Sequence, residues 1–221
     1  MAQIDENTVS VEHQIKVLQR ALMIHPEGKG LRVMFVGNSI THHMPAPAIG
    51  WNYDWGMAAS APEKDYVHLC MDCIKKIHPD PAFCICGAGR WEMNWKNGES
   101  VFEEYQSARE FKADVIILRM IENCAKDGEK DHFAREWEKY VDFLDGTGKA
   151  RLIVTTSFWR HPMDEVIRDF AARRGQPLVE LGDLGGNAAM KAYGLFEHKG
   201  VASHPGDLGM AEIAARIMKV F

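Results

Sequence analysis

Short apolar runs alternate along the chain with longer segments in which apolar residues recur at helical spacing. The short runs carry few charges and are rich in Val, Ile, Leu, Phe and Cys, which is typical of strands buried on both faces of a sheet. Their ranges are Leu31–Gly37, Pro81–Gly87, Asp114–Met120, Arg151–Ser157 and Pro177–Gly182. The helical segments are Val9–Met23, Pro62–Ile77, Ser100–Phe111, Glu129–Leu144, Pro162–Arg174 and Gly206–Val220.

This alternation predicts an α/β fold. Successive strands that are joined by helices pair in parallel, and the helices then cover both faces of the sheet. We therefore expect a three-layer α/β/α sandwich with a five-stranded parallel sheet. No repeat, low-complexity tract or long linker divides the 221 residues. A single domain over residues 1–221 is expected, with residues 1–28 as a helical extension packed on it.

Composition and charge disfavour several classes of function. Lys and Arg total 26 against 31 for Asp and Glu, a net charge of −5, so no basic surface for nucleic acid is expected. The apolar runs are far shorter than the roughly 20 residues that span a bilayer, so we expect no membrane partner. The first residues lack the layout of a signal peptide, and the five cysteines are an odd number. Both features favour a cytoplasmic protein with reduced thiols.

Candidate chemistry follows the ends of the predicted strands. In an open parallel sheet, sites form beyond the carboxyl ends of the strands. Ser39 follows the first strand, Gly87 and Gly89 the second, and Asn123 the third, while His204 precedes the last helix. A histidine can take the proton of a serine hydroxyl, and backbone and amide N–H groups can stabilise the resulting oxyanion. These residue types together predict nucleophilic catalysis at this edge.

The order of these residues resembles the SGNH (GDSL-like) hydrolase family over nearly the whole chain. Gly37-Asn38-Ser39 resembles the family's Gly-Asp-Ser block, with Asn38 in place of the usual Asp, and His204-Pro205 followed by Gly209-Met210 resembles its final block. The resemblance implies a flavodoxin-like fold and carboxylic ester hydrolysis through an acyl-enzyme, without a metal or organic cofactor. It implies these roles: Ser39 as nucleophile, His204 as base, and Gly89 (alternatively Gly87), Asn123 and the Ser39 N–H as oxyanion donors.

One position departs from the family pattern. The family usually has an acid three residues before the histidine, and here that residue is Val201. A backbone carbonyl can orient His204 in a Ser–His dyad, or a carboxylate can come from elsewhere in the chain. The carboxylates considered are Asp207, Glu122, Glu92 and Glu197. Loss of activity is the third alternative.

Tryptophans suggest the substrate class. Five of the six follow predicted strands: Trp51, Trp55, Trp91, Trp95 and Trp159. Core packing explains some of them, but aromatic faces at this edge also suit sugars. We expect a small-molecule or carbohydrate ester as substrate, with acetyl-type O-acyl groups, bound by Trp55, Trp91, Trp159 and Arg90. Arg90, Arg119 and Arg160 could bind a carboxylate, for example on an acidic sugar, or pair with Glu92 or Glu122.

The remaining cysteine and histidine motifs favour structural roles. Cys70, Cys73, Cys84 and Cys86 lie in apolar segments, so we expect core packing rather than a zinc or redox site. His42 and His43 have no partners at a metal-ligand spacing, so no metal site is predicted. Two alternatives to an esterase stay open: a non-catalytic glycan-binding module on the same fold, and an acyltransferase.

Overall fold

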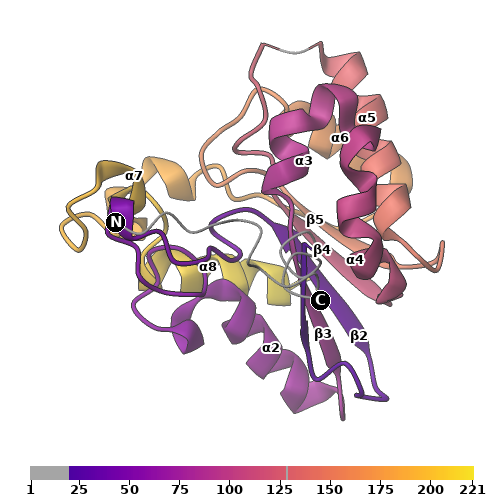
Figure 1. Ribbon diagram of the computed structural model, residues 1–221, viewed down its shortest axis with the longest axis horizontal. Helices are drawn as coiled ribbons and strands as arrows, with labels where there is room; N and C mark the ends of the chain where they lie inside the picture. Colours follow the sequence, from indigo (N-terminus) through magenta and orange to yellow (C-terminus); the bar gives the residue numbers. More distant parts are fainter. Residues whose placement is uncertain (1–19, 128) are drawn as a thin grey trace, which may run out of the picture.

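A six-stranded sheet forms the centre of the molecule (Figure 1). The computed structural model describes residues 20–127 and 129–221. The strand order is β1-β3-β2-β4-β5-β6, and all neighbours pair in parallel except β1 with β3. The strands are β1 (Ala21–Ile24), β2 (Arg32–Gly37), β3 (Ala82–Gly87), β4 (Val115–Arg119), β5 (Arg151–Thr155) and β6 (Leu178–Val179).

Helices cover both faces of the sheet, as the alternation of elements predicts. The α-helices are α2 (Tyr66–Ile77), α3 (Gly89–Asn94), α4 (Gln106–Glu110), α5 (Lys130–Leu144), α6 (Asp164–Arg174), α7 (Lys199–Ala202) and α8 (Asp207–Met218). Short 3-10 helices are η2 (Pro47–Ile49), η3 (Pro62–Lys64), η4 (Trp95–Tyr105), η5 (Leu184–Gly186) and η6 (Ala188–Met190). Figure 1 shows α3 to α6 on one side of the sheet and α2 with α8 on the other.

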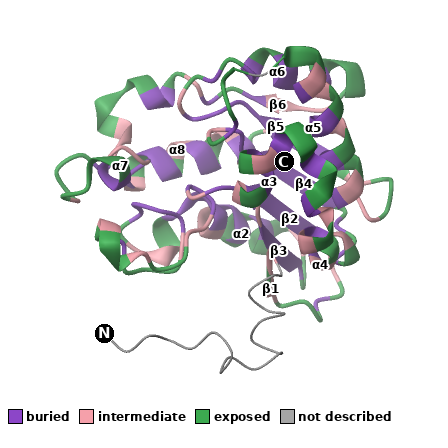
Figure 2. Cartoon of the chain, turned by 45° about the horizontal axis from the view of Figure 1, so that its top comes forward, coloured by how far each residue is buried: buried purple, intermediate pink, exposed green. Residues whose placement is uncertain are grey.

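Each central strand supplies side chains to two hydrophobic cores. Along β2, Met34 and Val36 pack into the core beneath α5 and α6, whereas Val33 and Phe35 pack into the core beneath α2 and α8. Successive residues of a strand point to opposite faces, so a strand covered on both sides must be apolar throughout. Figure 2 shows the result, with buried strands between helices whose outer faces are exposed. Among the described residues, no helix is long and apolar enough to span a membrane.

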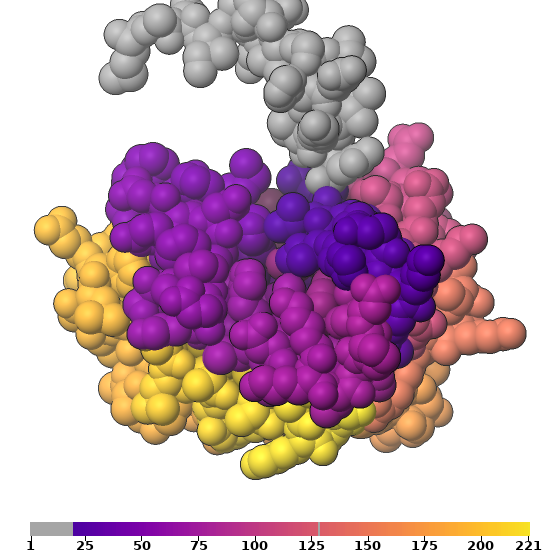
Figure 3. Space-filling model, turned by 90° about the horizontal axis from the view of Figure 1, so that it is seen from below, coloured from indigo at the N-terminus to yellow at the C-terminus, as the bar shows by residue number. Residues whose placement is uncertain are grey.

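The C-terminal segment closes the second of these cores. In the space-filling view of Figure 3, the last residues of the chain lie against the segment that contains α2. The ring of Phe221 packs edge-on against that of His78, with 6.0 Å between ring centroids. Helix α8 packs against α2 in this core, and the last residue contacts the position that follows α2.

The sequence-based prediction was wrong at the first strand. Residues 21–23 were expected at the end of a helix over Val9–Met23, but Ala21–Ile24 form β1 and pair antiparallel with β3, Ala21 opposite Cys86. The exposed edge of β3 offers unpaired N–H and C=O groups, and pairing with them stabilises a strand in so short an apolar segment. The rest of that helix, and of the expected extension over residues 1–28, lies outside the described residues up to residue 19.

Two other elements are shorter than predicted. The helix expected over Ser100–Phe111 is divided between η4 and α4, and Asn97 within η4 has non-helical dihedral angles. The last strand contains two residues rather than the six of Pro177–Gly182.

Cys73 also differs from expectation, because it is exposed, whereas Cys70, Cys84, Cys86 and Cys124 are buried.

Gly37 brings three strand ends together. It ends β2, opposite Gly87 of β3 and Arg119 of β4. A Cβ at this position would lie 1.8 Å from Thr41 Oγ1 and 2.5 Å from the Arg119 carbonyl oxygen. Only glycine therefore fits where the chain turns from β2 into the loop that carries Ser39.

We expect Gly37→Ala to lower the free energy of unfolding by about 3 kcal/mol, because backbone atoms and a buried threonine must move to admit the methyl group. Urea denaturation followed by circular dichroism measures the change. Gly186→Ala is the matched control, since a Cβ there meets nothing within 4 Å. Equal stability of the two variants would contradict the packing argument.

Candidate active site

Ser39 and His204 lie together at the carboxyl edge of the sheet. Ser39 is in the turn after β2, and His204 is in the short loop between α7 and α8. The Ser39 Oγ and His204 Nε2 atoms are 2.8 Å apart, although 165 positions separate the residues in the chain. Both are half-buried. The distance is that of a hydroxyl hydrogen bond to a ring nitrogen, the arrangement that a serine nucleophile and its base require.

A backbone carbonyl orients the histidine. His204 Nδ1 lies 2.7 Å from the Gly200 carbonyl oxygen, in α7. Because a carbonyl only accepts, Nδ1 carries the hydrogen, and Nε2 then presents its lone pair to the Ser39 hydroxyl. Of the alternatives considered for the missing acid, the geometry is that of a dyad with a backbone carbonyl.

The four carboxylates that could have oriented His204 lie in other environments. Asp207 accepts hydrogen bonds from the Ser60 N–H and hydroxyl and from Lys64. Glu92 and Glu122 belong to a buried network described below. Glu197 is exposed. In the described part of the chain, none of the four hydrogen-bonds to His204.

Val201 lies in a hydrophobic cluster. Its side chain is completely buried and packs with Trp51, Met57, Ala58 and Ala192. A carboxylate among these side chains would lose its hydration without gaining a partner there. The position where the family pattern has an acid therefore contributes packing here.

The pKa of His204 is low for a histidine. Burial lowers it to about 4, and the positive charge of Arg119 acts in the same direction, against the Gly200 carbonyl and Glu122. The ring of Trp159 packs edge-on against the imidazole, with 5.2 Å between ring centroids. At neutral pH the imidazole is neutral and able to accept a proton.

Two backbone N–H groups beside Ser39 are free. Those of Ser39 and Gly89 donate to no acceptor within residues 20–127 and 129–221. The Gly87 N–H, the alternative donor, instead bonds to the Arg20 carbonyl at 2.8 Å, as part of the contact with the β1 segment. The Ala88 N–H bonds to the Gly37 carbonyl at 2.6 Å and so ties the Gly89 loop to the Ser39 loop. This geometry favours Gly89 over Gly87 as an oxyanion donor.

Glu92 holds Asn123 next to these groups. Asn123 Nδ2 donates to Glu92 Oε2 at 2.6 Å, and the Ile121 N–H donates to Glu92 Oε1 at 2.5 Å. Ile121 has a φ of +99°, a conformation that costs energy for a β-branched residue. The completely buried Glu92 therefore sets both the backbone of this loop and the direction of the Asn123 amide.

Asn38 links two carboxylates. Its Nδ2 donates to Glu92 Oε1 at 3.0 Å and to Glu122 Oε2 at 2.6 Å, and its Oδ1 accepts from Arg119 Nη2 at 2.5 Å. Arg119 also pairs with Glu122 at 2.8 Å. Burial and the charge of Glu122 raise the pKa of Glu92. Burial opposes ionisation of Glu122 too, but Arg119 and the Phe158 N–H outweigh it and lower its pKa.

The residues predicted to bind substrate divide into two groups. Trp91 is completely buried and stacks on Tyr140, so the prediction that it contacts substrate is wrong. Arg90 is exposed but pairs with Glu104 at 3.1 Å, the structural alternative that its position left open. Trp55 and Trp159 are half-buried and retain accessible surface.

Tyr53 is a further aromatic residue at this edge, beyond the tryptophans predicted from the sequence. Its ring stacks on that of Trp55 at 4.5 Å, and the residue is 44% exposed. The backbone ties this segment to the site, since the Met57 N–H donates to the Ser39 carbonyl at 2.8 Å. A tyrosine between two tryptophans, Trp51-Asn52-Tyr53-Asp54-Trp55, was the available signal.

No protein-family model and no curated protein matches the sequence. Solved structures do match the fold. A two-domain esterase active on acetylated mannans has a TM-score of 0.55 at 18% identity, covering 89% of this chain and 49% of that one, so this chain spans about half its length. A catalytic mutant of Axe2, an acetylxylan esterase from Geobacillus stearothermophilus, has a TM-score of 0.54 at 15% identity, covering 87% and 94%.

A member of the lipolytic G-D-S-L family from Veillonella parvula has a TM-score of 0.52 at 14% identity, covering 86% of this chain and 98% of that one. At these identities the likeness concerns the fold. The chain thus has the α/β/α fold of GDSL-type (SGNH) esterases, and its edge strand β1 is antiparallel to its neighbour β3.

Proposed function

We propose that the protein is a serine esterase that hydrolyses small carboxylic esters, of acetyl type, on carbohydrates. The observation that carries this proposal is the 2.8 Å contact between Ser39 Oγ and His204 Nε2, together with the N–H groups of Ser39 and Gly89, which bond to no acceptor among the described residues. The similar structures are compatible with it, because one acts on acetylated mannans and another is an acetylxylan esterase.

In the acylation step, His204 Nε2 takes the hydroxyl proton as Ser39 Oγ attacks the ester carbonyl carbon. The oxyanion of the tetrahedral intermediate accepts hydrogen bonds from the N–H groups of Ser39 and Gly89 and from the Asn123 amide. The C–O bond to the sugar then breaks, and the imidazolium gives its proton to the departing alkoxide oxygen. The product of this half-reaction is an acyl-Ser39 ester and a free alcohol.

Deacylation repeats these events with water. His204 removes a proton from a water molecule as its oxygen attacks the acyl carbon, and the proton then passes to Ser39 Oγ when the acyl bond breaks. Gly200 keeps the imidazole in the required tautomer in both half-reactions. No metal is needed to balance either step.

The network of buried carboxylates acts as a positioning device. Glu92 aligns the Asn123 amide, and Asn38 connects Glu92 to the loop of Ser39. Neither side chain needs to touch the ester. The aromatic pair Tyr53 and Trp55, together with Trp159, provides apolar faces suited to a sugar.

We expect Ser39→Ala to lower the rate of p-nitrophenyl acetate hydrolysis by at least about 10³-fold, because the acyl-enzyme cannot form. Labelling of the wild-type protein by a fluorophosphonate probe should be lost in the same variant. Ser100→Ala is the control, since that hydroxyl bonds only to the Asn97 carbonyl in a surface helix. Equal rates in all three proteins, near the buffer blank, would contradict the proposal and favour a glycan-binding module.

The pH dependence of kcat/KM should reflect the low pKa of His204. The neutral imidazole is the active base, so activity is retained as pH falls and is lost only near about pH 4, where the ring becomes protonated. Initial rates on p-nitrophenyl acetate, with circular dichroism at each pH to establish folding, measure this limb. A limb centred near the ordinary histidine value of about 6.5 would contradict it.

Asn38→Asp, which restores the residue usual in the family pattern, should destabilise this protein. The new carboxylate would lie against Glu92 and Glu122 with only Arg119 to balance three acids, which we expect to cost about 3 kcal/mol. The repulsion raises the pKa of the introduced group above its unfolded value, so the loss should be greater at about pH 8 than at about pH 5.

Urea denaturation at both pH values measures this loss of stability. Asn187→Asp is the matched control, because Asn187 caps η6 at an exposed position where aspartate also caps well. A loss for Asn38→Asp that is the same at both pH values would overturn the electrostatic explanation.

A further inference from the structure

Arg160 differs from the two other arginines near the strand ends. Arg90 pairs with Glu104 and Arg119 with Glu122. The exposed Arg160 forms no ion pair with any residue in the described part of the chain. Of the three side chains that could bind a carboxylate of a substrate, Arg160 alone retains its full set of donors.

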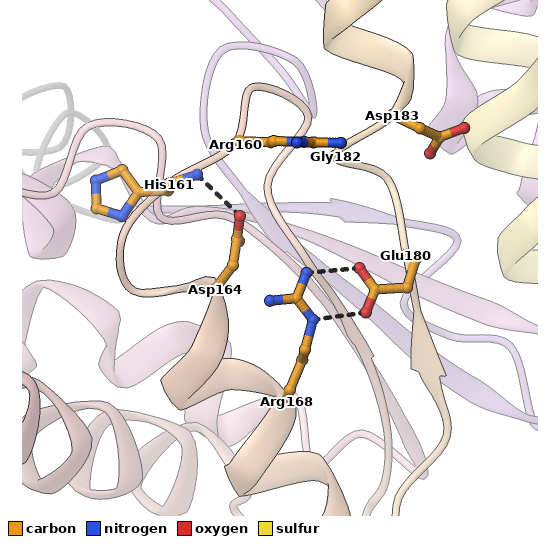
Figure 4. Close-up of a pocket in the computed structure, with 7 residues that line it drawn as sticks. All are labelled: Arg160, His161, Asp164, Arg168, Glu180, Gly182 and Asp183. Carbon is orange, nitrogen blue, oxygen red and sulfur yellow. Dashed lines mark hydrogen bonds and ion pairs between the residues drawn. The ribbon is translucent and has the colours of Figure 1, made fainter.

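Arg160 lies over an open cleft. In Figure 4 its guanidinium extends across the cleft above the Arg168–Glu180 pair, on the side of Gly182 and Asp183. The cavity measures about 520 Å³, and an adjoining cavity of about 350 Å³ shares Arg160, Gly182 and Asp183 with it. Together they have room for a sugar ring.

Two carboxylates of the cleft are neutralised by other arginines. Glu180 accepts both hydrogen bonds of the Arg168 guanidinium, at 2.7 and 2.9 Å (Figure 4). Asp183 accepts from two nitrogens of Arg216, at 2.6 and 2.9 Å. Neither needs Arg160 as a counter-ion.

The third carboxylate is buried and fully hydrogen-bonded. Asp164 is 4% exposed and accepts from the Ser157 N–H, the Ser157 hydroxyl and the His161 N–H, each at 2.8 Å. His161 also has a structural role, because its Nε2 bonds to the Cys124 carbonyl at 3.1 Å. In the described residues, Arg160 is thus the arginine of the cleft that pairs with no carboxylate, whereas Arg168 has only part of its guanidinium left beside its two bonds to Glu180. The Gly182 N–H also bonds to no protein acceptor there.

Trp159 connects the cleft to the candidate base. Trp159 lines the smaller cavity, and its ring contacts that of His204. A sugar whose ester group lies at Ser39 would therefore pass Trp159 and reach Arg160 with its distal substituents. Gly185 and Gly186 contribute no side chains to the wall of the smaller cavity.

We propose that this cleft binds the alcohol part of the ester and that Arg160 binds a carboxylate on it, so that the preferred substrates are O-acetylated acidic sugars. The planar guanidinium can donate two parallel hydrogen bonds to one carboxylate, which a neutral sugar cannot accept in the same way. The inference rests on the proposed esterase function for its catalytic part, but binding in the cleft can be measured separately.

The first experiment compares two acetylated substrates that differ in one charge. These are an O-acetylated methyl glucuronoside and the same compound with its uronate carboxyl converted to an uncharged methyl ester, assayed by acetate release with the wild type, Arg160→Gln and Arg90→Gln. We expect the wild type and Arg90→Gln to prefer the acidic substrate in kcat/KM by about 5-fold or more, less so at high salt. Arg160→Gln should lose that preference and keep its activity on the neutral ester.

Binding without turnover separates this inference from the proposed function. Methyl glucuronoside and methyl glucoside, which carry no ester, are titrated into the wild type and Arg160→Gln and followed by NMR. We expect only the glucuronoside to bind, and only with Arg160 present. Binding of this kind without any esterase activity would support the binding site in the cleft and contradict the proposed esterase function. Ester hydrolysis that does not depend on Arg160, together with glucuronoside binding that does not depend on it, would contradict the binding site in the cleft and leave the esterase function standing.

Discussion

Buried hydrogen bonds among charged and amide side chains hold the carboxyl edge of the sheet in one arrangement. Asn38 follows β2, Arg119 ends β4, Glu92 comes from α3, and Glu122 bonds to the Phe158 N–H after β5. Inside the protein such bonds are strong, and a member left without its partner is costly. The loops after four strands are therefore fixed with respect to one another, and Ser39, Gly89 and Asn123 lie on three of them.

The hydrogen bond that orients His204 depends on position 201, which contributes packing rather than charge. Val201 fills a small core with Trp51 and Ala192, so α7 offers the imidazole a carbonyl rather than a carboxylate. A carbonyl fixes the ring and its tautomer, but it carries no full charge to stabilise an imidazolium. Burial therefore dominates the pKa of His204, and the imidazole is a weaker base than one paired with an acid. A base of this strength would suit the ester hydrolysis proposed above, because an alcohol leaves more readily than an amine.

The sequence predicted the regular parts of this structure better than the irregular ones. The sandwich was predictable because two-sided burial leaves apolar strands. That Ser39 and His204 lie close together was predictable from the order of motifs that resembles the family, and the structure has them 2.8 Å apart. Strand β1 was not, since four residues become a strand only when the edge of β3 is present. The orienting Gly200 carbonyl was not either, because every residue has one and only the fold selects it. The burial of Trp91 was not predictable either, because a position after a strand does not determine whether a side chain faces the core or the solvent.

Asn38, which stands where the family pattern has an aspartate, changes the balance of charge around the candidate site. Two carboxylates share one buried arginine here, and a neutral amide between them donates to both while its oxygen takes a hydrogen bond from Arg119. The charges of Arg119 and Glu122 also act on His204 in opposite directions, so burial remains the main cause of its low pKa. An aspartate at position 38 would add a negative charge to this balance and favour the protonated imidazole. The Asn38 amide thus allows a buried carboxylate network to coexist with a neutral His204 imidazole.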